Sequence, residues 1–303
     1  NLSAFVASCL LGGAVVATRK VVGDIAPLNL AFLRYMLGGA YLAAVVAMLR
    51  PGTLRVARAD LPNIVLLGVL MYALFPFLFN TSLRYTTASR GAVILALMPL
   101  FTAVLGAFAR SEQLQPVQWL GVVCSIAGVA AVFAESGLQF ADGRSAMIGN
   151  GMMVVVALVG AVYSVAARPI LMRYGAPPVT ALAMLAGAAL LCLPAFFRGV
   201  TQEVTDAPAS TNALVLYLAI PGGALAFFLA SFALSRLSAT QASIYINLNP
   251  LVATILAALL LGETLTWWFG LGFLLVVIGL LLANLPRMRG AQTASGGTQT
   301  VRP

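Results

Sequence analysis

The chain has 303 residues, of which 61% are hydrophobic and only 8% are charged, and its formal net charge is +9. A soluble protein carries roughly 25% charged residues, so this composition excludes an ordinary soluble domain and indicates a polytopic membrane protein. The basic residues are scattered singly at the ends of apolar runs, which argues against a nucleic-acid-binding protein.

Ten apolar runs follow one another along the chain, and each is long enough to cross roughly 30 Å of hydrocarbon. The first run ends in Arg19 and Lys20 without a small-residue cleavage site, so we predict a helix there rather than a signal peptide. The predicted spans are 3–22, 28–49, 61–82, 88–109, 115–134, 147–170, 178–198, 212–234, 240–261 and 266–286.

The polar connectors orient these spans. Longer polar stretches lie at 50–60, 135–146 and 199–211. The first of them carries Arg50, Arg55 and Arg58, close to the end of a span. Basic residues in such positions mark the cytoplasmic side, so we expect both termini in the cytoplasm.

The sequence repeats itself with one offset of 151 residues and no gap. The matched positions are Leu83 with Leu234, Ala88 with Ala239, Pro99 with Pro250, Leu100 with Leu251, Glu112 with Glu263, Gly121 with Gly272, and Gly128 with Gly279. Such an internal duplication is typical of secondary transporters. Because each half contains five spans, an odd number, the second copy must cross the membrane in the opposite direction.

The predicted fold is therefore an all-α polytopic membrane protein, with ten transmembrane helices in two inverted five-helix repeats around a central cavity. We assign the first repeat to residues 1–134 and the second to 147–286, with a connecting loop at 135–146. The tail at 287–303 is rich in Gly, Ser, Thr and Gln, and we expect it to be disordered or to derive from an expression vector.

The repeated motifs resemble the drug/metabolite transporter superfamily, specifically the ten-helix EamA-type exporters. In those exporters each repeat has a Pro, then a Glu, then a helix that opens and closes with Gly. The matching residues are Pro99, Glu112, Gly121 and Gly128, and in the second copy Pro250, Glu263, Gly272 and Gly279. Within the superfamily the chain is most similar to the YddG-type aromatic amino-acid exporters. The resemblance implies export across a bacterial inner membrane by alternating access.

The placement of charges limits the chemistry. All eight carboxylates fall at span ends or in connectors, and the chain has no His. We therefore expect neither an enzyme nor a metal or other cofactor. Because no span centre carries a carboxylate that could bind a proton or Na⁺, we expect facilitated diffusion or exchange.

Polar and aromatic side chains at helical spacing are the candidate substrate contacts. They are Tyr72, Asn80, Tyr163, Ser164, Gln241, Tyr245 and Asn247, with Lys20 as an attractor for an anionic group. The candidate hinges are Pro76, Pro99, Pro221, Gly222 and Pro250. The alternative for each Tyr is an interfacial anchor, and for each Asn an interhelical hydrogen bond. Arg34 could snorkel toward the membrane surface and is not counted among the contacts.

Two further groups have structural interpretations. The paired glycines are expected to pack helices closely. Glu112 and Glu263 are expected to cap helix ends or to tie helices together.

We expect spans 1, 3, 4, 6, 8 and 9 to line the cavity, with Phe75 and Phe79 beside the tyrosines. Apolar and aromatic walls with a few amide and hydroxyl groups suit aromatic or large neutral amino acids. The alternatives are a broad-specificity drug, purine or sugar exporter of the same fold, and a non-transporting membrane protein. The expected partners are a small-molecule substrate and the lipid bilayer, and the expected oligomeric state is a monomer.

Overall fold

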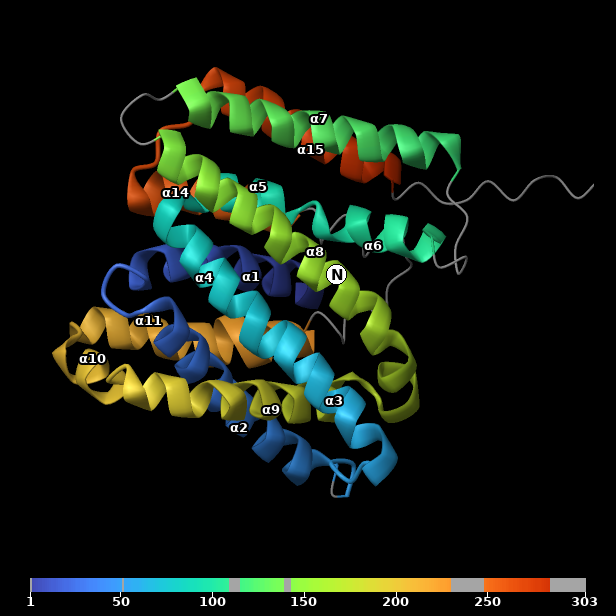
Figure 1. Cartoon of the computed structure of the whole chain (residues 1–303), viewed down its shortest axis with the longest axis vertical. Coiled ribbons are helices and arrows are strands. Elements are labelled where there is room, and N and C mark those ends of the chain that lie inside the picture. Colours follow the sequence, from blue (N-terminus) through green and yellow to red (C-terminus); the bar gives the residue numbers. More distant parts are fainter. Residues whose placement is uncertain (1, 51, 109–114, 139–142, 230–247, 284–303) are drawn as a thin grey trace, which may run out of the picture.

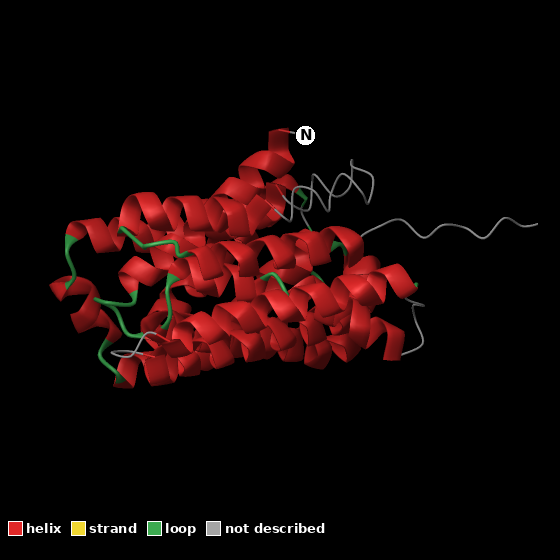
Figure 2. Cartoon of the chain, turned by 90° about the horizontal axis from the view of Figure 1, so that it is seen from above, coloured by secondary structure: helices red, strands yellow, loops and turns green. Residues whose placement is uncertain are grey.

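A computed structural model describes residues 2–50, 52–108, 115–138, 143–229 and 248–283 of the chain. Its helices pack into one bundle, in which some run nearly horizontally in Figure 1 and others cross them obliquely, and the described residues include no strand (Figures 1 and 2). The first half contains α1 (Leu2–Val21), α2 (Pro27–Leu49), a short 3₁₀ turn η1 (Arg58–Asp60), α3 (Leu61–Gly68), η2 (Val69–Leu74), α4 (Phe75–Tyr85), α5 (Ala88–Leu95), α6 (Met98–Phe108) and α7 (Pro116–Leu138). The second half contains α8 (Gly143–Tyr174), α9 (Ala176–Phe197), α10 (Val200–Asp206), α11 (Ala209–Ala219), η3 (Ile220–Leu225), α14 (Leu248–Leu261) and α15 (Trp267–Ala283).

Each predicted span has a helical counterpart. Eight described helical segments are long and apolar enough to cross a membrane, and α14 and α15 are shorter apolar helices that correspond to the last two spans. The all-α polytopic fold is thus confirmed. The connection predicted at 135–146 is shorter in the structure, because α7 continues to Leu138 and α8 begins at Gly143. Hydropathy marks where a helix leaves the hydrocarbon, and here the helices continue beyond that point.

The packing of the helices follows the inverted duplication. The two most extensive contacts join helices that occupy equivalent places in the two halves, α7 with α15 and α2 with α9. The other contacts come in exchanged pairs, since α1 packs on α14 while α8 packs on α5 and α6. This is the pattern that a pseudo-two-fold axis between the repeats generates.

Glycines bring α7 and α15 into backbone contact. A Cβ at Gly121 would lie 2.6 Å from the carbonyl oxygen of Gly279, and a Cβ at Gly128 would lie 2.6 Å from that of Gly272. The later glycine of α7 therefore contacts the earlier glycine of α15, so the two helices are antiparallel. The prediction that these glycines pack helices closely is confirmed.

Two π-helical segments interrupt the third and eighth spans. Each bound of η3 lies 151 residues after the corresponding bound of η2, so the two segments are equivalent in the repeats. A helix from the other half approaches the residue before each segment. A Cβ at Gly187 would lie 2.6 Å from the carbonyl oxygen of Gly68, and one at Gly38 would lie 2.7 Å from that of Ala219. Such π segments occur often at functional sites.

Carboxylates tie the two halves together at the end of the bundle that carries α10, on the left in Figure 1. Glu203 accepts hydrogen bonds of 2.9 Å from the Ala26 amide and from the Asn29 side chain. Glu263 accepts bonds from the amides of Ala88 and Ser89, at the start of α5, at 2.6 and 3.0 Å. The interhelix tie predicted for Glu263 is confirmed, whereas Glu112 lies outside the described residues.

A further carboxylate joins the halves at the opposite end of the bundle. Asp60 pairs with Arg173 at 2.8 Å and accepts a hydrogen bond of 2.6 Å from the hydroxyl of Tyr174. Since Asp60 follows α2 and both partners end α8, this tie again connects the first half with the second.

Candidate functional site

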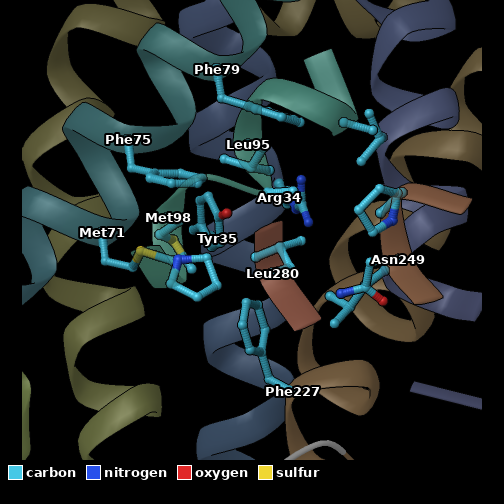
Figure 3. Close-up of a pocket in the computed structure, with 17 residues that line it drawn as sticks. Arg34, Tyr35, Met71, Phe75, Phe79, Leu95, Met98, Phe227, Asn249 and Leu280 are labelled. Atoms are coloured by element: carbon cyan, nitrogen blue, oxygen red, sulfur yellow. The ribbon is translucent and has the colours of Figure 1, made fainter. Parts of the chain in front are cut away.

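A cavity of about 210 Å³ lies between the two halves of the molecule (Figure 3). Most of its wall is apolar, and Pro99 and Pro250, which are equivalent in the two repeats, both face it. The 17 lining residues are Leu11, Ala14, Val15, Arg34, Tyr35, Met71, Phe75, Phe79, Ala92, Leu95, Ala96, Met98, Pro99, Phe227, Asn249, Pro250 and Leu280.

Arg34 is the charged residue of this lining. Its side chain is 8% exposed, and Figure 3 shows it in the midst of the lining residues. The guanidinium donates a hydrogen bond of 3.4 Å to the carbonyl oxygen of Gly222, within η3, and its central carbon lies 5.4 Å from the ring centroid of Tyr35. Its Nε has no hydrogen-bond partner among the described residues.

Asn249 is the amide of the lining, and it reaches the cavity from the second repeat (Figure 3). Its Oδ1 is buried and accepts no hydrogen bond from the described residues. The described lining thus offers one cation and one free amide oxygen, and it contains no carboxylate. Within the described ranges no group of three or more His, Cys, Asp or Glu residues could hold a metal ion.

Aromatic rings form one side of the cavity and the layer behind it. Phe75 and Phe79 are stacked, with ring centroids 6.0 Å apart. From Tyr35, which lines the cavity, an edge-to-face row of rings continues to Tyr72 and Tyr163 behind the lining, with successive centroids 5.1 and 6.2 Å apart. This row joins α2, η2 and α8, so it links the two repeats beside the cavity.

The structure brings two of the predicted contact residues together and places others apart. Tyr72, which is 2% exposed, and Tyr163 lie behind Tyr35 in this row. Asn80 is buried and donates to the carbonyl oxygen of Pro27 at 2.9 Å, while Ser164 donates to Gly160 in its own helix at 2.8 Å. Lys20 is exposed near the end of α1.

The other three predicted contacts, Gln241, Tyr245 and Asn247, lie outside the described residues. A direct contact with substrate stays a prediction for all eight residues. None of the five that the structure describes is among the residues that line the cavity.

The predicted hinge residues lie at or near the cavity. Pro99 and Pro250 line it, and Gly222 in η3 accepts the hydrogen bond from Arg34. Pro221 belongs to the same π segment, and Pro76 follows η2 in α4. A proline removes a helix hydrogen bond, which fits their place beside the π segments. Their role as hinges stays a prediction.

Sequence reasoning missed the contributions of spans 2 and 10, which supply Arg34, Tyr35 and Leu280, and the cavity lining includes no residue of span 6. Arg34 does not snorkel, since it is buried. A signal was present, because Arg34 lies seven residues after Pro27, the first residue of α2. At a rise of about 1.5 Å per residue this is roughly 10 Å into the membrane span, deeper than expected for a simple interfacial anchor.

Comparisons with known proteins find a matching family model, similar transporters and a similar fold. The model of the EamA-like transporter family matches residues 1–134 and 147–285. The chain is 31% identical to a probable terminal-alkyne amino-acid exporter of Streptantibioticus cattleyicolor, over 83% of this chain and 84% of that protein. It is 28% identical to an uncharacterized transporter of Archaeoglobus fulgidus, over 90% of this chain and 92% of that protein. A solved crystal structure with 21% identity superposes with a TM-score of 0.63 and covers 93% of this chain and 95% of that one.

Proposed function

Because the chain belongs to the EamA-like transporter family, it is a membrane transporter, and we propose that it exports small amphiphilic metabolites, chiefly aromatic and other neutral amino acids. Both repeats supply walls of the central cavity, so rocking of one repeat against the other would expose a bound solute to each side in turn. We also propose a monomer as the transporting unit, since one chain carries both repeats of the family.

The observation that carries the proposal is the combination of size and lining of this cavity. A volume of about 210 Å³ holds a single small solute. Sites for drug-sized ligands are larger, roughly 300–1,000 Å³, which counts against the alternative of a broad drug exporter. Phe75, Phe79 and Phe227 offer ring faces to an apolar side chain, whereas a sugar needs many more polar partners than this wall provides.

Similarity to a probable terminal-alkyne amino-acid exporter supports amino acids as the substrate class. The described lining has no acidic residue that could take up and release a proton, which supports facilitated diffusion or exchange. We therefore expect transport to follow the gradient of the solute.

Counterflow in proteoliposomes tests this function. Vesicles loaded with unlabelled phenylalanine should accumulate labelled phenylalanine without an imposed proton gradient. The Phe75→Leu variant keeps an apolar side chain but loses a ring contact worth roughly 0.5–1.5 kcal/mol, which corresponds to a two- to tenfold weaker apparent affinity for aromatic solutes. Its affinity for leucine should change little.

The matched control is Phe197→Leu, because Phe197 is 83% exposed on α9 and does not line the cavity. Its apparent affinities should equal those of the wild type. Strict dependence of flux on a pH gradient would disprove the coupling mode. Absence of exchange for every amino acid in the panel would disprove the substrate class.

We also propose that the chain resides in a bacterial inner membrane with both termini in the cytoplasm. The cluster of Arg50, Arg55 and Arg58 supports this orientation, since basic residues favour the cytoplasmic side. A reporter that is active only in the cytoplasm should be active when fused after Pro286. Activity of a periplasm-specific reporter at the same position would show that the C-terminus lies outside the cytoplasm and would contradict the proposed orientation.

A further inference from the structure

The charge of Arg34 lacks a partner of opposite sign in the described structure. Its side chain is 92% buried, since 8% is exposed, and its one described hydrogen bond, to Gly222, is long at 3.4 Å. Burying a charge without a counter-ion is costly, particularly inside a membrane. Nε also lacks a hydrogen-bond partner among the described residues, so at least one N–H of the guanidinium fork is unused.

The acidic residues that the structure describes with partners are engaged elsewhere. Asp24, Glu203 and Glu263 accept hydrogen bonds between the halves at the α10 end, and Asp60 pairs with Arg173 at the opposite end. The described lining itself contains no carboxylate. The balancing anion for Arg34 is therefore best supplied by the solute in the cavity.

The lining has a second polar atom without a hydrogen-bond partner among the described residues, and this atom is an acceptor rather than a donor. Asn249 Oδ1 is a buried acceptor with no donor among the described residues, and Asn249 lies in the second repeat whereas Arg34 lies in the first. Apolar side chains such as Leu280 and Phe227 line the same cavity (Figure 3). One cavity thus offers a cationic donor and a neutral acceptor within an otherwise apolar lining.

We infer that Arg34 binds the carboxylate of the transported solute and that Asn249 accepts a hydrogen bond from its ammonium group. The site then selects zwitterionic α-amino acids that carry an apolar side chain. This inference rests on the proposed function and adds the groups that recognise the backbone of the amino acid. The planar fork of Arg suits a carboxylate, because two parallel N–H···O bonds can form. An amide in place of the carboxylate would bring its own N–H donors against those of Arg34 and lose the charge pairing.

The test begins with the wild-type protein and needs no substitution. Inhibition of phenylalanine counterflow, and thermal stabilisation of the purified full-length chain, are measured with phenylalanine, phenylalaninamide and 3-phenylpropionate. Phenylalaninamide lacks the carboxylate, and its apparent affinity should be weaker by about tenfold to a hundredfold, as expected when a hydrogen bond to a charged group is lost. 3-Phenylpropionate keeps the carboxylate but lacks the ammonium group, so its apparent affinity should fall by less than that of phenylalaninamide.

Variants then assign the two groups. Arg34→Gln should abolish the preference for the acid over the amide, and Arg34→Lys, which keeps the charge but loses the fork, should retain part of it. Asn249→Ala should lower the apparent affinity for phenylalanine but leave the apparent affinity for 3-phenylpropionate unchanged. Arg84→Gln is the matched control, because it removes the same charge from an exposed side chain near the end of α4. The ratios of the apparent affinities for the three solutes should equal those of the wild type.

The outcomes separate this inference from the proposed function. If wild-type protein transports phenylalanine but binds its amide equally well, the role of Arg34 is wrong and the amino-acid substrate stands. If 3-phenylpropionate is transported and no amino acid is, Arg34 binds a carboxylate but the proposed substrate class and the role of Asn249 are wrong. If none of the carboxylates stabilises the protein or is transported, both proposals are wrong.

Discussion

Gly279→Ala is expected to force α7 and α15 apart and to lower sharply the amount of folded protein. A Cβ at this position would lie 2.5 Å from the carbonyl oxygen of Gly121 and 2.7 Å from the amide nitrogen of Ser125. Backbone atoms on the opposing helix have little freedom to move away, and overpacking of this kind costs about 1–3 kcal/mol or more. Thermal unfolding in detergent should show a fall in apparent Tm of roughly 2–10 °C.

The same helix provides the control. Gly270 also lies in α15, but a Cβ there would meet no atom within 4 Å. Gly270→Ala should therefore leave the Tm unchanged or raise it slightly, because alanine is favoured over glycine in a helix by up to about 1 kcal/mol. Equal Tm values for the two variants would show that the α7–α15 contact is looser than the structure indicates.

Glu263→Ala should also destabilise the protein strongly. The first amides of a helix have no partner within it, and the Glu263 carboxylate accepts those of Ala88 and Ser89 as well as the Ser89 hydroxyl, at 2.6, 3.0 and 2.5 Å. Hydrogen bonds to a charged group contribute about 1.5–3 kcal/mol each. Because three bonds share one carboxylate, we expect a total loss of about 2–4 kcal/mol, measured as the change in unfolding free energy.

Glu263→Gln keeps one acceptor oxygen, so its unfolding free energy should fall by about half as much as that of Glu263→Ala. Asp206→Ala removes an exposed carboxylate that accepts a hydrogen bond from Gln202 within α10, and it should change stability by no more than about 0.5 kcal/mol. If Glu263→Ala unfolds at the same temperature as Asp206→Ala, the tie between the repeats has no energetic importance.

The fold was predictable from the sequence because its main signals are additive over many residues. Hydropathy over about 20 residues located all ten spans, and the offset of 151 residues identified the repeat. The role of Gly121 and Gly279 was also predictable, since a residue without a side chain permits backbone contact wherever it faces another helix. Glu263 was recognisable because a carboxylate at a span end suits the exposed amides of a nearby helix start.

The candidate site was less predictable because the sequence does not show which face of a helix meets the cavity. A stripe at four-residue spacing placed Tyr72, Pro76 and Asn80 on one face of the third span. The structure instead turns Met71, Phe75 and Phe79 toward the cavity, one residue earlier at each position. Both stripes have the same four-residue spacing, so the error concerned the face of the helix and not its period. The polar groups of the predicted stripe have partners inside the protein, because Tyr72 packs against other rings and Asn80 donates to the carbonyl oxygen of Pro27.

Arg34 was missed for a different reason. The sequence shows its depth along α2 but not the direction in which its side chain points, and a long cation can reach the membrane surface from many positions. Its direction depends on the neighbouring second repeat, where the carbonyl oxygen of Gly222 receives its hydrogen bond. That partner is 188 residues away in the sequence.

The contact between α7 and α15 has a consequence for motion during transport. Gly121 meets Gly279 and Gly128 meets Gly272, so the pseudo-two-fold operation that exchanges the repeats maps this set of contacts onto itself. If transport exchanges the conformations of the two repeats, this interface stays the same at both extremes of the cycle. The bonds of Glu263 to Ala88 and Ser89 join non-equivalent positions, so the symmetry of the exchange does not by itself preserve them. The α7–α15 contact is then the part of the molecule that stays fixed while the repeats move, whereas the carboxylate ties at the α10 end can differ between the two extremes.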